Sequence, residues 1–334
     1  MEKKHVYNKI FTESEWQEVN RQNKETLDDF IEEYTQRKMK PSTLAQYRND
    51  LRIIMLFIRK FCENKSIFEL GKRDFRKLSI WLNNDCGMSS ARTNRVMSAC
   101  RSLLTYCEDS DEYDYDQNVA KKVHGLPKER VRTDEDTFFM TFEQIMKVRK
   151  KLLEMGELQL CVLHMLLFDS GARRNEICQV QKYDLGTKNK TNIVIGKRGK
   201  TFPLVYLDDT KELIREWLKA RGEDDIDSLW IIKDGNTKKP ASYEMIYDWV
   251  MKIRKVLSDL EGREIDIFPH SYRHSRAECM LQGLDTRIID KQTGKPKKFA
   301  LEQVQTFLHH ENPATTQGYL KDHSEDLINE MFDI

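Results

Sequence analysis

The segment Leu308–Tyr319 reads LHHENPATTQGY, with two adjacent histidines, a helix-breaking proline and a tyrosine nine residues after the second histidine. Few of these features are needed to pack a core, so we interpret the segment as part of a reaction centre. A phenol can attack a phosphate while cationic side chains hold the anion, and this combination suits phosphoryl transfer. The chain upstream should then supply arginines, a lysine and another histidine.

The length and composition limit the class of protein. A chain of 334 residues favours two domains over one. The net charge is only +1, because 56 lysines and arginines offset 55 acidic residues, which excludes a uniformly basic coat but allows local basic patches. Seven cysteines without a Cys-x-x-Cys pair indicate reduced thiols, and no apolar run approaches the roughly 18 residues of a membrane span. We expect a cytoplasmic protein without a membrane segment.

The first hundred or so residues carry apolar side chains at helical spacing in four successive stretches. We expect a helical domain over residues 1–116, followed by a polar linker over residues 117–137. The fourth helix exposes a polar face that is either solvated or laid against DNA phosphates. The arginines of this face are Arg92, Arg95 and Arg101.

Residues 138–334 mix helical and strand-like patterns. Strand-like stretches lie at 192–195, 201–206 and 229–232, and the two glycines within Gly196–Lys200 join the first two stretches as a hairpin. Helical spacing predominates elsewhere. We therefore expect a mainly α fold with a small antiparallel β-sheet in the second domain.

Three polar clusters precede the opening segment, and each contains groups that would bind a phosphate. Each also has a plainer interpretation: an arginine paired with a carboxylate, a solvated hairpin tip, and a capped surface helix. A metal site built from the histidines lacks the usual ligand spacing, so we expect no metal. The clusters are Arg173 in a turn after Gly171, Lys197 with Arg198 and Lys200 at the hairpin tip, and His270 one helical turn before Arg273.

In this order, the motifs resemble those of the tyrosine recombinase (phage integrase) family. SGARRNEI at Ser170–Ile177 is similar to the family's Thr-Gly-Leu-Arg-x-Ser-Glu-Leu, and Ile195–Lys200 is similar to its lysine hairpin. His270–His274 resembles its His-x-Leu-Arg-His, Leu308–His310 its Leu-Gly-His, and Thr316–Tyr319 its Thr-x-x-Tyr. The resemblance implies a two-domain clamp, in which a helical SAM-like core-binding domain precedes an integrase catalytic domain.

The resemblance also implies a mechanism. Tyr319 would attack the scissile DNA phosphate and form a 3′-phosphotyrosyl link, while Lys197 would protonate the leaving 5′-oxygen. Planar arginine forks suit the non-bridging oxygens of that phosphate. The phosphotyrosine conserves the bond energy, so the resemblance implies neither ATP nor any other cofactor. The implied catalytic residues are Arg173, Lys197, His270, Arg273, His310 and Tyr319.

The implied partners are double-stranded DNA and further copies of the chain. A C-terminal helix over Ser324–Phe332 would dock on a neighbouring copy and link a dimer or tetramer. The implied function is a site-specific recombinase or integrase on the nucleoid of a bacterial or phage-infected cell. The alternative is a phage or mobile-element transcriptional regulator, such as a repressor, that keeps the fold and binds DNA without recombining it.

Two departures from the family pattern bear on the site. His309 stands where the family usually has a glycine, and a glycine there would ease the end of a helix. The stretch between Arg273 and His310 is also longer than the usual one, and it includes the lysine-rich segment Asp290–Lys298. We expect this segment to be either a solvated loop or a DNA contact. Its candidate contacts are Lys295, Lys297 and Lys298.

Overall fold

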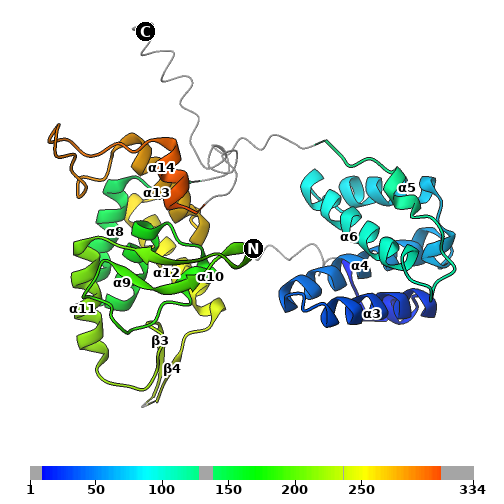
Figure 1. Cartoon of the computed structure of the whole chain (residues 1–334), viewed down its shortest axis with the longest axis horizontal. Helices are drawn as coiled ribbons and strands as arrows, with labels where there is room; N and C mark the ends of the chain where they lie inside the picture. The colour runs from blue at the N-terminus through cyan, green and yellow to red at the C-terminus, as the bar shows by residue number, and fades with distance from the viewer. Residues whose placement is uncertain (1–9, 128–137, 236, 310–334) are drawn as a thin grey trace, which may run out of the picture. The chain divides into compact units, whose positions relative to one another are not determined.

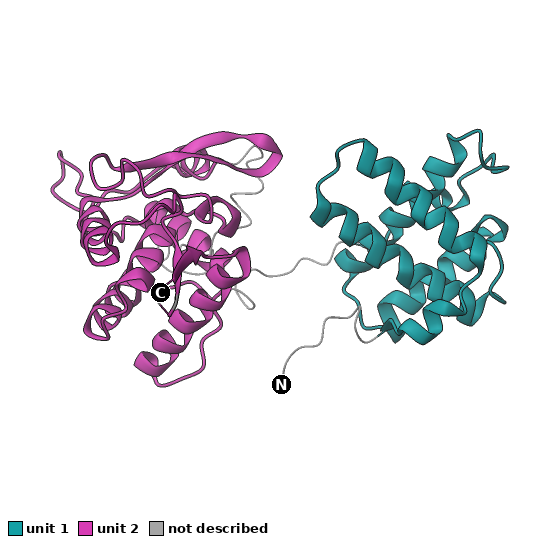
Figure 2. Cartoon of the chain, turned by 90° about the horizontal axis from the view of Figure 1, so that it is seen from below, with its two compact units in different colours: residues 1–131 teal, residues 132–334 magenta. Residues whose placement is uncertain are grey.

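The computed structural model describes residues 10–127, 138–235 and 237–309. The chain divides into two compact units, Met1–Val131 and Arg132–Ile334, which Figure 2 colours separately. Each unit has a hydrophobic core of its own. Within the described ranges, no helix is long and apolar enough to cross a membrane. All seven cysteines are free thiols.

The first unit is helical throughout its described part, as the apolar spacing predicts (Figure 1). Its longest helix, α4, buries every side chain from Ile53 to Ile58. A helix buried on several sides needs several neighbours, and α3 and α6 pack against it. The elements are α2 (Glu13–Gln17), α3 (Arg21–Gln36), α4 (Pro41–Phe61), η1 (Ile67–Glu69), α5 (Lys72–Ile80), η2 (Trp81–Asp85), α6 (Ser90–Glu108) and η3 (Val119–Lys122).

The first core extends past residue 116, where the sequence suggested that a linker begins. Ala120 is fully buried and Val123 is 9% exposed, and both belong to this core. The Asn118 side-chain amide donates to the Arg101 carbonyl and to Thr105 Oγ1, both at 2.9 Å. These contacts fasten the polar stretch to α6. The stretch is too short for a periodic apolar pattern, which is why the sequence does not reveal its packing.

The second unit is built around α9 (Leu158–Ser170), which is buried from Leu160 to its end. Its sequence has no polar face, so it must be covered on all sides, and α8, α11, α12 and α13 all pack against it. The other helices are α8 (Phe142–Glu154), α10 (Arg174–Ile177), η4 (Lys197–Gly199), α11 (Asp208–Arg221), α12 (Tyr243–Glu261), α13 (Pro269–Gln282) and α14 (Leu301–Phe307).

Two antiparallel hairpins complete the second unit. β1 (Lys190–Ile195) pairs with β2 (Thr201–Val205), as the sequence predicts. β3 (Ile231–Asp234), which overlaps the strand predicted at 229–232, pairs with β4 (Thr237–Pro240) in a second sheet that the sequence analysis missed. β4 reads TKKP and carries no apolar alternation, so it gives no strand signal. In Figure 1, this second hairpin extends from the end of the unit away from α14.

Candidate active site

A glycine sets the turn that carries Arg173. Gly171 ends α9 with a φ of 58°, and a Cβ at this position would lie 2.7 Å from Leu308 Cδ2, so only glycine fits. The Glu176 carboxylate then accepts from the Arg173 backbone N–H at 2.7 Å and from Arg173 Nη1 at 3.0 Å. The Glu176 side chain is buried, whereas the Arg173 side chain keeps 27% of its surface exposed. The carboxylate therefore holds a guanidinium that still reaches solvent.

Arg273 joins three segments that are far apart in the sequence. Its residue is only 2% exposed, on α13. Nη1 donates to the Gly171 carbonyl at 2.8 Å, and Nη2 donates to the Leu308 carbonyl at the end of α14. A buried charge needs such partners because burial without them is costly. The contacts bring the Arg173 turn, α13 and α14 together, as the motif order predicts.

His270 lies in the first turn of α13, one turn before Arg273. Its ring centroid lies 4.9 Å from that of His274, at 80° between the ring planes. Desolvation, followed by the charges of His274, Arg273 and Arg173, lowers the pKa of His270 to about 4. The imidazole is therefore neutral near pH 7, and part of it reaches solvent. A neutral ring at this position can accept a proton.

The tip of the β1–β2 hairpin lies beside the Arg173 turn. A Cβ on Gly196, the residue after β1, would lie 2.8 Å from the Phe202 ring and 3.2 Å from Glu176 Oε1, so this end of the hairpin packs against the carboxylate that holds Arg173. The Gly196 N–H donates to the Lys200 carbonyl at 2.7 Å and closes the tip. Lys197 follows Gly196 and is exposed. The structure thus brings the tip end of the hairpin beside the Arg173 turn, with Lys197 exposed in the tip itself.

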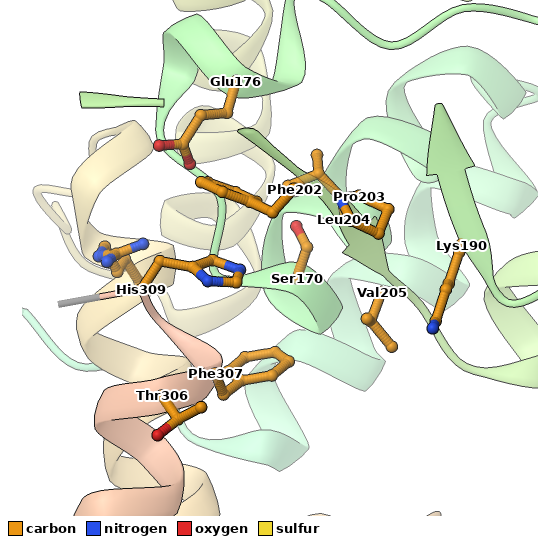
Figure 3. A pocket seen from close by; sticks show the side chains of 11 residues that line it. Ser170, Glu176, Lys190, Phe202, Pro203, Leu204, Val205, Thr306, Phe307 and His309 are labelled. Carbon is orange, nitrogen blue, oxygen red and sulfur yellow. The ribbon is translucent and has the colours of Figure 1, made fainter. Parts of the chain in front are cut away.

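His309 adopts the left-handed backbone conformation that explains why a glycine would suit this position. Its φ is 54° directly after α14 ends. The His309 ring stacks on Phe202, with ring centroids 3.7 Å apart and planes at 24°. Both rings line a cavity of about 240 Å³ together with Ser170 and Phe307, and Figure 3 shows the imidazole pointing into it. Desolvation lowers the pKa of His309. The stacking partner compensates part of the backbone strain.

Two predicted catalytic residues, His310 and Tyr319, lie outside the described residues, as does the C-terminal helix predicted over Ser324–Phe332. The remaining four, Arg173, Lys197, His270 and Arg273, all belong to the second unit.

Two of the three arginines of the first unit that are predicted to bind DNA, Arg92 and Arg95, form ion pairs with a carboxylate that the sequence analysis did not single out. Asp50, on α4, is 1% exposed and lies 2.6 Å from Arg92 Nη2 and 3.3 Å from Arg95 Nε. Gln46 Nε2 donates to the same carboxylate at 3.0 Å. We call Gln46, Asp50, Arg92 and Arg95 the Asp50 cluster. The Arg92 side chain is 14% exposed and that of Arg95 is 48% exposed, so Arg95 faces solvent and Arg92 mainly joins α6 to α4.

Arg101, the third arginine of this helix, is partly buried, and its backbone carbonyl accepts from Asn118. A signal for Asp50 does exist in the sequence. It is an acidic residue three positions after Tyr47 and four before Ile54, so it falls within the helical spacing of the apolar side chains.

The lysine-rich segment Asp290–Lys298 forms an ordered loop. The Asp290 carboxylate accepts from the Gln292 and Thr293 N–H groups, both at 2.9 Å, and the Lys297 N–H donates to the Ile288 carbonyl at 2.8 Å. Lys297 Nζ lies 5.1 Å from the Phe299 ring centroid. Lys295 and Lys298 are exposed. The only acidic side chain of the segment is used inside the loop, so the positive charge of the lysines faces outward.

Comparisons with known proteins identify similar sequences. Residues 139–295 match the model of the Phage integrase family. The SPbeta prophage-derived recombinase-like protein YomM of Bacillus subtilis (strain 168) is 27% identical over 330 residues, covering 91% of this chain and 89% of that protein. Tyrosine recombinase XerA of Thermococcus onnurineus (strain NA1) is 27% identical over 299 residues, covering 89% and 92%.

Solved structures show the same fold. A lambda integrase tetramer bound to a Holliday junction matches with a TM-score of 0.64 and 15% identity, over 89% of this chain and 76% of that chain. The XerH site-specific recombinase bound to its difH substrate also matches with a TM-score of 0.64, at 18% identity, over 89% and 81%. The chain therefore carries the domain of the phage integrase family over residues 139–295, and it is similar to tyrosine recombinases along most of its length.

Proposed function

We propose that this chain is a site-specific tyrosine recombinase, or integrase, that cuts and rejoins double-stranded DNA through a 3′-phosphotyrosyl intermediate. The observation that carries the proposal is the Arg273 guanidinium, which contacts the Gly171 carbonyl, 102 residues away, and the Leu308 carbonyl, 35 residues away. This one side chain thereby contacts the turn that carries Arg173 and the segment that leads into His310. Such convergence of polar groups is what transfer of a phosphoryl group requires.

In the proposed reaction, Arg173 and Arg273 bind the non-bridging oxygens of the scissile phosphate and stabilise the charge of the pentacoordinate state. The Tyr319 oxygen forms a bond to phosphorus as the bond to the 5′-oxygen breaks. Neutral His270 accepts the phenolic proton, Lys197 gives a proton to the 5′-oxygen, and His310 donates a hydrogen bond to the phosphate. Attack by a 5′-hydroxyl then reverses these steps and releases Tyr319.

The proposed partners are double-stranded DNA and further copies of the chain. The lambda integrase and XerH structures contain DNA, and the lambda integrase is a tetramer. We propose that the first unit is the core-binding domain and the second the catalytic domain, and that the chain acts on the nucleoid. The helix over Ser324–Phe332 would join neighbouring copies. The proposed DNA contacts are Arg92, Arg95, Arg101, Arg198, Lys200, Lys295, Lys297 and Lys298.

The test is capture of the covalent intermediate on a nicked DNA site, from which the 5′-hydroxyl fragment is lost by diffusion. Wild-type protein should accumulate a protein–DNA adduct that withstands denaturant, and Tyr319→Phe should give none. Tyr183→Phe is the matched control, because Tyr183 is an exposed tyrosine of the same unit, and this variant should form the adduct normally. Tight binding of the site by the wild type without any adduct would contradict the proposal.

A second candidate function is favoured by His309. Its side chain occupies the position of the family's usual glycine and fills part of the cavity beside Arg273. A site altered in this way suits a regulator that holds DNA without cutting it. In a promoter–reporter assay, such a regulator would repress equally well as wild type and as Tyr319→Phe. Loss of repression in Tyr319→Phe, together with adduct formation by the wild type, would remove this candidate.

A further inference from the structure

Five charged side chains of the second unit form a network beside the two site arginines. They are Asp169, Asp209, Arg276, Asp285 and Arg287, which we call the Arg287 network. Arg287 lies at its centre, with Nη2 2.7 Å from Asp169 Oδ1, Nε 2.9 Å from Asp285 Oδ1 and Nη1 3.0 Å from Asp209 Oδ2. The Asp169 and Asp285 side chains are 1% and 4% exposed, and that of Arg287 is 14% exposed.

One side of the network fixes the Arg173 turn. Asp169 is in the last turn of α9, two residues before Gly171, whose carbonyl accepts from Arg273. The second oxygen of Asp169 accepts from the Leu207 N–H at 2.9 Å and from Thr210 Oγ1 at 2.6 Å. Every polar contact of this carboxylate therefore leads either to Arg287 or to the start of α11. The end of α9 cannot shift without breaking one of them.

The other side of the network fixes the helix that carries Arg273. Arg276 lies one turn after Arg273 on α13, and its Nη1 donates to Asp285 Oδ2 at 2.6 Å. Asp285 in turn accepts from both Nε and Nη2 of Arg287 at 2.9 Å. Arg276 also packs against the turn itself, because a Cβ on Gly171 would lie 3.7 Å from Arg276 Cγ.

We infer that Arg287 is a positioning residue for the recombination reaction: it sets the distance between Arg173 and Arg273 by clamping α9 and α13 to each other. The inference rests on the proposed function, since it concerns how the two arginines share one phosphate. Arg287 contacts Asp169 on α9 directly. It is linked to Arg276 on α13 through Asp285, which accepts from both arginines. It acts through these residues and touches neither candidate catalytic arginine in any contact that the structure describes.

Only an arginine can serve this position. Its planar fork presents donors in three directions at once, toward three carboxylates on three different segments. The guanidinium carbon also lies near two aromatic rings, 5.3 Å from the Phe142 centroid and 5.8 Å from the Phe168 centroid. A lysine would keep the positive charge but could not hold all three carboxylates in this arrangement. Arg287→Lys is therefore the informative substitution.

The experiment compares Arg287→Lys with Arg221→Lys in the full chain. Arg221 is a matched control, because its side chain is 1% exposed and donates to Asp224 at 2.8 and 2.5 Å in the same unit. It lies twelve residues after Asp209 on α11, about 18 Å along the helix axis. Three quantities are measured: affinity for the DNA site, the rate of adduct formation at saturating DNA, and amide hydrogen exchange of the segment around Gly171.

Both variants should lose thermal stability, but only Arg287→Lys should change the site. We expect its single-turnover rate of adduct formation to fall on the order of 100-fold, with DNA affinity within threefold of wild type. Exchange of the Gly171, Ala172 and Arg173 amides, which are hydrogen-bonded in the structure, should accelerate in this variant and not in Arg221→Lys.

A merely structural role for Arg287 predicts equal effects of the two substitutions, and that result would overturn the inference. So would unchanged exchange around Gly171 in Arg287→Lys. If wild-type protein forms no adduct, the proposed function fails, and the exchange measurement still decides whether Arg287 holds the turn.

Discussion

The Asp50 cluster of the first unit and the Arg287 network of the second are both largely buried, and the two are built in opposite senses. In the first unit a single carboxylate, Asp50, lies between two arginines, one of which faces solvent. In the second unit a single arginine, Arg287, lies between three carboxylates, and its side chain is 14% exposed. A central carboxylate orders cations on a surface, where an anionic partner can reach them. A central arginine satisfies acceptors on several segments and so orders the backbone around a site.

The largest expected effect comes from removing the centre of the first cluster. Asp50→Ala leaves Arg92 mostly buried without its carboxylate, and breaking such a pair costs about 3–5 kcal/mol of the free energy of unfolding. Asp28→Ala is the control, because its pair with Arg48 is largely exposed and should contribute less than about 1 kcal/mol. Urea unfolding followed by circular dichroism measures both. Equal costs for the two variants would mean that burial of Asp50 has no special role.

DNA binding should reveal what the Asp50 cluster does at the surface. Arg95→Ala removes the half-exposed guanidinium, so we expect weaker binding and a loss of about 0.9 from the slope of log K against log salt concentration. Arg48→Ala, on the same unit, serves as the control for the loss of an exposed charge. An unchanged slope in Arg95→Ala would mean that the cluster holds the helices together and does not contact phosphate.

A change in pH should act on the second unit through His164, a fully buried histidine of α9. Desolvation lowers its pKa to about 4. Its Nε2 faces the Ile145 carbonyl at 2.9 Å, which can only accept, so Nε2 carries the proton and Nδ1 accepts from the Tyr272 hydroxyl at 2.8 Å. The unfolded chain, with a pKa near 6.5, binds a proton more readily. Stability is therefore retained above pH 6.5 and lost as the pH falls from 6.5 towards 4.

The loss attributable to His164 is about 3 kcal/mol, because one pKa unit corresponds to roughly 1.4 kcal/mol. His164→Gln keeps a donor for the Ile145 carbonyl and an acceptor for the Tyr272 hydroxyl but cannot be protonated in this range. Urea unfolding of wild type and His164→Gln at pH 7, 6, 5 and 4 should give diverging free energies, with the variant less sensitive to acid. Parallel curves would show that His164 is not held neutral by the fold.

The sequence predicts those parts of the structure that depend on local patterns. Each of these patterns spans only a few residues of sequence. They are the helical spacing of apolar side chains, the two glycines of the β1–β2 hairpin and the His270–Arg273 spacing. The resemblance implied that the Arg173 and Arg273 motifs serve one site, and in the structure Arg273 contacts the carbonyls of Gly171 and Leu308. Because the family pattern has a glycine where this chain has His309, even the left-handed backbone at that position was foreseeable.

The two ion clusters could not be predicted in the same way. Asp169 and Arg287 are 118 residues apart, and neither stands out from the 109 other charged residues of the chain by its neighbours alone. Their pairing depends on how α9 and α13 pack, which is a tertiary property. Likewise, the buried Asp50 interrupts no local pattern strongly enough to identify its two partners on α6.

The smallest expected effect is at His309, which does not belong to the Arg287 network. His309→Gly removes the left-handed strain, worth about 1 kcal/mol, and also the stack on Phe202, worth a similar amount, so stability should change little. His309→Ala keeps the strain and loses the stack, so it should cost about 1 kcal/mol. Adduct formation should change less than threefold in His309→Gly, because the carbonyl that accepts from Arg273 belongs to Leu308 and is kept in this variant. A fall as large as that expected for Arg287→Lys would mean that the aromatic stack, rather than the ion network, positions the end of α14.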